Sequence, residues 1–369
     1  MSLRQRLYSG LLFLLVAVTL VISMSLSLPE TSWQFSISDE QTLQANLPGE
    51  PSQTVTEFYD GDKHIPALFH LALEEPDTVE SYQEFNQLMS LNSVLIDALD
   101  KNTLSMHLED GSINLLQNEP RYLNDLSAMF WLQLGCGSLG FLICLLIKSA
   151  RPNHQGINAF ALTGFSYLLF TFSAAIYSTR NLLIDGQLFH TLSMLNHTGA
   201  MLFSASLTAF LWSYPKAIGK HAVSIFAYGV FVANIIVDGF QLVDGPAMGS
   251  YIWVFSLFLF GLSGSIVQWW FARKDPLDRG AVRWLLLSIY AGTVFFAGGI
   301  MLPILLNIPP VASQGLMFTT FLLMYGGLAL GVLRYRLFDL ERWWFSLWAW
   351  FLGRVAILLM AGVLASFLP

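Results

Sequence analysis

Apolar stretches of about 20 residues recur nine times along this chain of 369 residues. A helix needs about that many residues to cross the hydrocarbon core of a bilayer. Only 12% of the chain is charged, against roughly 25% in soluble domains. The sequence therefore predicts a polytopic α-helical membrane bundle of about nine spans, and it argues against an ordinary soluble enzyme. The predicted spans are Leu11–Leu28, Ala128–Ile147, Ile157–Ser178, Phe189–Tyr214, Ala222–Phe240, Tyr251–Phe271, Trp284–Leu306, Gly315–Leu333 and Phe345–Leu368.

One polar segment, residues 29–127, interrupts this pattern. It carries 18 acidic residues against three basic ones, whereas the rest of the chain carries 15 basic and seven acidic residues. We therefore expect an acidic domain inserted after the first span of a basic membrane body. The predicted parts are an anchor (1–28), a small α+β domain (29–127), a seven-span bundle (128–333), a cytoplasmic junction (334–343) and a ninth span (344–369) that ends outside.

The basic residues fix the expected orientation. Alternate connections, starting from the N-terminus, hold 13 lysines and arginines, and the opposite short connections hold only Arg180. Because short cytoplasmic loops are rich in Lys and Arg, we expect the N-terminus in the cytoplasm and residues 29–127 outside. The first span has a second interpretation as a signal peptide, since Arg4 and Arg6 precede a short apolar run.

The polar segment shows alternating and helical patterns. Trp33–Ser38, Thr54–Tyr59 and Ala67–Leu73 are predicted strands. Thr78–Leu99 has apolar residues at helical spacing, and Leu104–Leu108 with Ile113–Leu116 predicts a hairpin around Asp110-Gly111. A helix followed by a hairpin resembles the C-terminal part of a PDZ-like domain. That resemblance implies a groove for an extended peptide, with Tyr82, Phe85 and Met89 as candidate ligand contacts, although core packing is the plainer interpretation.

A few polar residues fall inside or near predicted spans, where they are costly and often functional. Asn196 and His197 are adjacent in the fourth span. They are interpreted either as residues that make a hydrogen bond between helices or as a ligand or proton site. Asn234, Gln268 and the mid-span Arg354 are candidate buried polar residues, and Asp238 is expected at the membrane interface. Gly135, Gly137 and Gly140 in the second span, and Gly326, Gly327 and Gly331 in the eighth, predict close helix packing.

Two short stretches resemble a known family. They are Glu119-Pro120-Arg121-Tyr122-Leu123-Asn124-Asp125-Leu126, which runs into the second span, and Leu333-Arg334-Tyr335-Arg336-Leu337-Phe338-Asp339-Leu340-Glu341. Together with the span order, they resemble the multi-pass sensor region of bacterial sensor histidine kinases, including the quorum-sensing type with an extracytoplasmic PDZ-like domain. The resemblance implies a bacterial inner-membrane location, a homodimer formed through a kinase region, and a kinase that this chain lacks.

The second stretch has its own physical interpretation. Arg334 and Arg336 can bind lipid phosphates, while Phe338 dips into the interface and Asp339 pairs with an arginine. The four residues are the expected signal-coupling junction, and a plain positive-inside anchor is the simpler alternative.

The sequence predicts a sensory or receptor module for a peptide or small-molecule signal. A transporter or channel subunit is the alternative, with a polar path along Asn196, His197, Asn234, Gln268 or Arg354. A membrane enzyme is weaker still and would need His197, Asp238 and Arg354 together. No catalytic residue, metal ligand set or cofactor motif is predicted. The lipid bilayer is an expected partner, and a nucleic acid is not, because the basic residues form no continuous patch.

Overall fold

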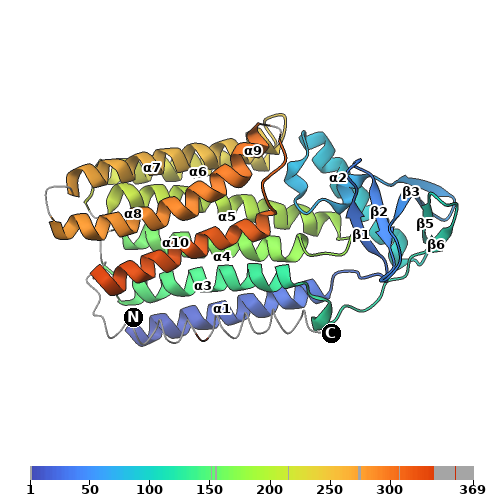
Figure 1. Ribbon diagram of the computed structural model, residues 1–369, viewed down its shortest axis with the longest axis horizontal. Helices are drawn as coiled ribbons and strands as arrows, with labels where there is room; N and C mark the ends of the chain where they lie inside the picture. Colours follow the sequence, from blue (N-terminus) through green and yellow to red (C-terminus); the bar gives the residue numbers. More distant parts are fainter. Residues whose placement is uncertain are drawn as a thin grey trace.

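The computed structural model describes residues 2–150, 152–153, 156–214, 216–272, 276–306, 308–335 and 354. The molecule is mostly helical, with a bundle of long helices and a small antiparallel sheet (Figure 1). The sheet and the helix α2 (Tyr82–Asp100) lie beyond one end of the bundle. The polar segment therefore forms a body of its own that caps the bundle.

The bundle helices follow the apolar runs. They are α1 (Leu3–Leu26), α3 (Ala128–Ala150), α4 (Ile157–Tyr177), α5 (Gly186–Ser213), α6 (Lys220–Gly239), α7 (Ile252–Ala272), α8 (Pro276–Phe296), α9 (Leu302–Leu305) and α10 (Gln314–Tyr335). In the described part of the chain, six helices are long and apolar enough to cross a membrane. Four of them lie in α1, α3, α4 and α6. The fifth joins the π-helical segment η4 (Ala247–Tyr251) to α7, and the sixth runs from α8 through the π-helical segment η5 (Ala297–Met301) into α9. The predicted ninth span, Phe345–Leu368, lies outside the described residues, apart from Arg354.

Small residues bring the helices close, as the sequence predicted. A Cβ atom on Gly137 of α3 would overlap the Thr171 hydroxyl of α4, and one on Gly327 of α10 would overlap Ser288 of α8. Gly140 faces the ring of Tyr167 in the same way. These glycines are therefore required for the helix spacing.

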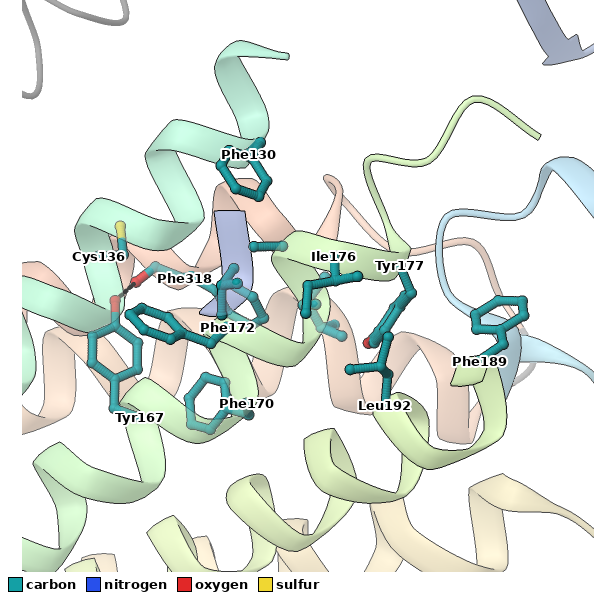
Figure 2. Packing of buried hydrophobic residues seen from close by; sticks show 14 of the residues in the cluster. Phe130, Cys136, Tyr167, Phe170, Phe172, Ile176, Tyr177, Phe189, Leu192 and Phe318 are labelled. Atoms are coloured by element: carbon teal, nitrogen blue, oxygen red, sulfur yellow. Dashed lines mark hydrogen bonds between the residues drawn. The ribbon is translucent and has the colours of Figure 1, made fainter. Parts of the chain in front are cut away.

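Aromatic side chains fill the centre of the bundle. Phe321 of α10 lies within 6 Å, centroid to centroid, of rings on α4, α5 and α8. Figure 2 follows this core along α4 from Tyr167 to Tyr177 and on to Phe189 in α5. The Tyr167 hydroxyl donates a hydrogen bond of 2.8 Å to the Phe318 carbonyl oxygen, so even this polar atom is satisfied inside the core.

The sheet has the order β1-β2-β3-β5-β6, and β4 also pairs with β3. Its strands are β1 (Gln34–Ile37), β2 (Leu43–Asn46), β3 (Gln53–Asp60), β4 (Lys63–Pro66), β5 (Leu104–Leu108) and β6 (Ile113–Leu115). The predicted strands at 33–38 and 54–59 and the predicted hairpin are confirmed. The predictions missed β2 and β4, which are only four residues long.

One local prediction is wrong, and the predicted helix is confirmed with a later start. Ala67–Leu73 contains the 3₁₀ turn η1 (Phe69–Ala72), because its apolar residues pack beneath the sheet without joining it. The helix predicted from Thr78 begins at Tyr82, where the Ser81 side chain caps it by accepting a hydrogen bond from the Glu84 amide. The residues before it form a second 3₁₀ turn, η2 (Pro76–Thr78), which is central to the candidate site.

Candidate functional site

A buried cluster of ionisable side chains joins the polar segment to the end of the bundle. We name it the polar junction. The polar segment contributes residues of η2 and α2, and the bundle contributes residues of α4, α5, α6 and η4. Its members are Glu75, Asp77, Tyr82, Tyr177, Arg180, His197, Asp238 and Tyr251.

At its centre His197 of α5 lies between two carboxylates. Its Nε2 atom is 2.8 Å from Asp77 Oδ2, and its Nδ1 atom is 2.8 Å from Asp238 Oδ2. All three side chains are at most 4% exposed. Because an imidazole donates from both nitrogens only when it is protonated, this geometry is that of an imidazolium held by one carboxylate from each body.

Two tyrosines add hydrogen bonds to these carboxylates, while Asp77 Oδ1 has no partner among the described residues. The Tyr82 hydroxyl donates to Asp238 Oδ1, and the Tyr251 hydroxyl donates to Asp77 Oδ2 at 2.9 Å. Desolvation and the nearby Asp238 carboxylate raise the pKa of Tyr82 above its ordinary value, so this hydroxyl stays a donor. Gly249 makes the approach of Tyr82 possible, because a Cβ atom there would overlap the Tyr82 hydroxyl.

Glu75 enters the bundle one residue before Pro76. Its Oε2 atom accepts a hydrogen bond of 2.5 Å from the Tyr177 hydroxyl, and its Oε1 atom has no partner among the described residues. Burial raises the pKa of Glu75 well above its ordinary value, and the neighbouring Asp77 and Glu74 carboxylates raise it further. The neutral acid is therefore the favoured form of this side chain.

Arg180, in the connection from α4 to α5, binds the backbone of the polar segment with its side chain. Its guanidinium donates to the carbonyl oxygens of Leu71 and Leu73, at 3.1 and 2.8 Å, and lies 4.4 Å from the centroid of the Phe189 ring. Burial lowers the pKa of Arg180 to about 10. This arginine is positioned to lock η1 against the bundle.

A second set of contacts joins the polar segment to the end of α1 and to the loop after α4. Arg121 is 3.2 Å from Glu30 Oε2 in an ion pair that is not aligned as a hydrogen bond, and it donates to the carbonyl oxygens of Ser25 and Thr179. Asn181 donates to Glu30 Oε1 at 2.6 Å. The polar segment is therefore fastened to three consecutive residues, Thr179, Arg180 and Asn181, in the connection from α4 to α5.

The structure separates the candidate ligand residues. Tyr82 and His197 belong to the polar junction. Phe85 is buried against Tyr82 and His190, and Met89 is buried as well but also lines a groove of about 470 Å³ between α2 and α5. Asn196 points away from His197 and donates to the Phe170 carbonyl oxygen at 3.1 Å.

The other predicted polar residues do not join this cluster. Asn234 donates to the Gly249 carbonyl oxygen at 2.5 Å, and Gln268 donates to the Lys216 carbonyl oxygen at 2.5 Å. Each therefore satisfies nearby backbone, which does not favour the polar path of a transporter. Arg354 is exposed, nothing is described of the Arg334 side chain, and Arg336, Phe338 and Asp339 lie outside the described residues.

Sequence reasoning missed most of the polar junction. Asp238 was expected at the membrane interface but is 1% exposed, because Tyr82 and His197 cover it. Glu75 and Asp77 were not singled out from the other residues of the acidic segment, and both are buried. The sequence signal that could have indicated this turn is Pro76, which lies between two acidic residues and shortly before the helix capped by Ser81.

Among the described residues, no group of three or more His, Cys, Asp or Glu side chains is arranged to hold a metal ion. Comparisons with protein-family models, with curated proteins and with solved structures find no match for this chain. Its function must therefore be argued from the polar junction itself.

Proposed function

We propose that this chain is the membrane sensory module of a bacterial signal-transduction protein. In this proposal, residues 29–127 or the bundle detect an extracytoplasmic or membrane signal, and the bundle passes the response to a cytoplasmic histidine kinase. The nine-span topology, the inner-membrane location, the PDZ-like character of the polar segment and a homodimer are parts of the same proposal. Six candidate spanning helices support its multi-pass membrane character.

The observation that carries the proposal is the insertion of η2 into the end of the bundle. Asp77 touches both α5 and η4, through His197 and Tyr251. Tyr82, at the start of α2, touches α6 through Asp238. A displacement of the polar segment must therefore break or move contacts to several bundle helices at once, which is what a coupling device requires.

The charges of the junction favour two discrete states. Glu75, Asp77 and Asp238 supply three carboxyl groups, whereas Arg180 and His197 supply two cationic groups. Buried charges are tolerated only when they are paired and hydrogen-bonded. The closed junction therefore depends on protonation and exact pairing, and a ligand that pulls on either body can shift it toward an open state.

One of the sequence stretches behind the resemblance also lies at this seam. Arg121, in the stretch Glu119–Leu126, contacts Glu30, the end of α1 and the connection after α4. A sensor family would need such a residue at the point where its outer domain meets its spans. This contact supports the proposal independently of the carboxylates.

The test is a hydrogen–deuterium exchange comparison of the full chain in lipid nanodiscs. Asp77→Asn should speed exchange around the junction and also at Lys216–Gly219, the connection between α5 and α6 at the opposite end of the bundle. Asp62→Asn is the matched control, because Asp62 is an exposed carboxylate at the turn between β3 and β4.

Changes confined to residues near 73–82 would contradict coupling through the bundle. If Asp77→Asn does not fold, Tyr82→Phe provides a milder variant, since it removes only the hydroxyl that contacts Asp238. Equal exchange at Lys216–Gly219 in Tyr82→Phe and the parent would then count against the proposal.

A further inference from the structure

The membrane-facing side of α7 and α8 carries a groove far from the polar junction. It has a volume of about 580 Å³ and is lined by Ile266 and Trp269 of α7 and by Arg283, Leu286, Leu287 and Tyr290 of α8. Among the described residues, its walls are mainly aliphatic and aromatic, with Arg283 as the one cationic side chain. A groove of this composition fits an amphiphile rather than a polar solute.

Arg283 is the unusual member of this lining. It is exposed, and it makes no hydrogen bond or ion pair within the described part of the chain. The same face of α8 continues through Leu287, which is 62% exposed. A guanidinium on an apolar, lipid-facing helix surface is costly unless it meets water or an anion.

The two ends of the groove differ in the residues that surround them. Trp269, Trp270 and Phe271 are all exposed at the end of α7, which is the aromatic pattern of a membrane interface. Tyr290 lies seven residues beyond Arg283, about 10 Å deeper at 1.5 Å per residue. Its hydroxyl contacts Ser265 Oγ at 2.7 Å, so its polar atom is turned to the protein and its ring is left for the groove.

We infer that this groove binds one anionic phospholipid, with the phosphate on Arg283 and an acyl chain along Ile266, Leu287 and Tyr290. Arginine suits this role because its planar guanidinium can contact two phosphate oxygens at once. Its long aliphatic stem can follow the apolar wall while the charged end reaches the headgroup layer. The assignment does not depend on which side of the membrane the α7–α8 connection faces, nor on the sensory proposal.

Native mass spectrometry of the full chain, released from nanodiscs of equal phosphatidylglycerol and phosphatidylcholine with matched acyl chains, tests this inference. The parent should retain phosphatidylglycerol preferentially. Arg283→Gln should reduce that preference about five-fold, since one basic residue near a lipid headgroup contributes about 1 kcal/mol. Arg283→Lys should retain part of it.

Lys216→Gln is the matched control, because Lys216 is an exposed cation in another connection and lies outside the groove lining. Leu287→Trp fills the groove without changing charge and should reduce retention of the bound lipid. Equal retention by Arg283→Gln and the parent, or an equal loss in Lys216→Gln, would overturn the site.

Inorganic phosphate separates a lipid from a free anion. Millimolar phosphate should leave the bound phosphatidylglycerol in place, since the acyl chain contributes part of the binding. Displacement by phosphate alone, with no effect of Leu287→Trp, would show an anion site rather than a lipid site and would overturn the inference.

Discussion

The aromatic core of the bundle and the polar junction are both buried, yet they are held together by different physics. Around Phe321 the contacts are between rings, and close packing determines their strength. Around His197 the contacts are between charged and hydrogen-bonding atoms, so their strength depends on partners and protonation. The strength of the core therefore depends on close packing alone, whereas the strength of the junction also depends on protonation.

The largest expected effect is in the core. Phe321→Ala should lower the free energy of unfolding by about 3–5 kcal/mol, as large aromatic truncations do, and the loss should be the same at pH 5 and pH 8. Thermal unfolding of the full chain in nanodiscs at both pH values measures it. A loss that varies strongly with pH would break the distinction between the two regions.

Asp77→Asn should cost less, about 1–3 kcal/mol, because the asparagine oxygen can still accept a hydrogen bond but the charge facing His197 is lost. We expect faster amide exchange in α2 and at Lys216–Gly219, with little change at the amides around Phe321. A variant whose core amides are destabilised as much as those of α2 would show that the junction is simply part of the core.

Glu75→Gln should have the opposite sign at high pH. The pKa of Glu75 is raised in the folded state, so its stabilising neutral form is fully present below the ordinary carboxyl pKa of about 4.3 and is lost as pH rises through the raised pKa. The glutamine stays neutral throughout. The variant should match the parent near pH 4 and be more stable than the parent at pH 8, where ionising the buried Glu75 destabilises the parent.

The same thermal unfolding series from pH 4 to pH 8 checks this prediction. Glu109→Gln, an exposed carboxylate after β5, is the control and should follow the parent at every pH. A Glu75→Gln curve parallel to that of the parent would contradict a neutral Glu75 in the junction.

The smallest expected effect is on the outer surface of the sheet. Glu57 Oε1 and His64 Nε2 are 3.4 Å apart, and both side chains are about half exposed. Because exposed ion pairs contribute little, His64→Ala should change the free energy of unfolding by no more than about 0.5 kcal/mol. A larger change would show that this pair also belongs to a cooperative network.

The sequence predicted the long helices well, because 20-residue apolar runs are a strong and local signal. The strands β3 and β5 were also visible through their alternation. Ala67–Leu73 was misassigned because a short apolar run has the same composition in a strand and in a packed turn. The helix α5 was also predicted as a span, but it is not among the six helices of the described residues that are long and apolar enough to cross a membrane.

The polar junction could not be predicted in the same way. Asp77, His197 and Asp238 are separated by 120 and 41 positions in the chain, so no local pattern links them. Glu75 and Asp77 resemble ordinary surface acids in an acidic segment. His197 was singled out as a polar residue within a span, but its partners come from the fold.

We expect the polar segment and the bundle to be energetically coupled through Asp77 and His197. A double-mutant cycle with Asp77→Asn, His197→Gln and the combined variant tests it most directly, with the opening free energy of amides in Tyr82–Phe85 as the readout. Directly contacting residues in one network should show an interaction of at least about 1 kcal/mol. Additive effects, with an interaction near zero, would contradict coupling through this contact.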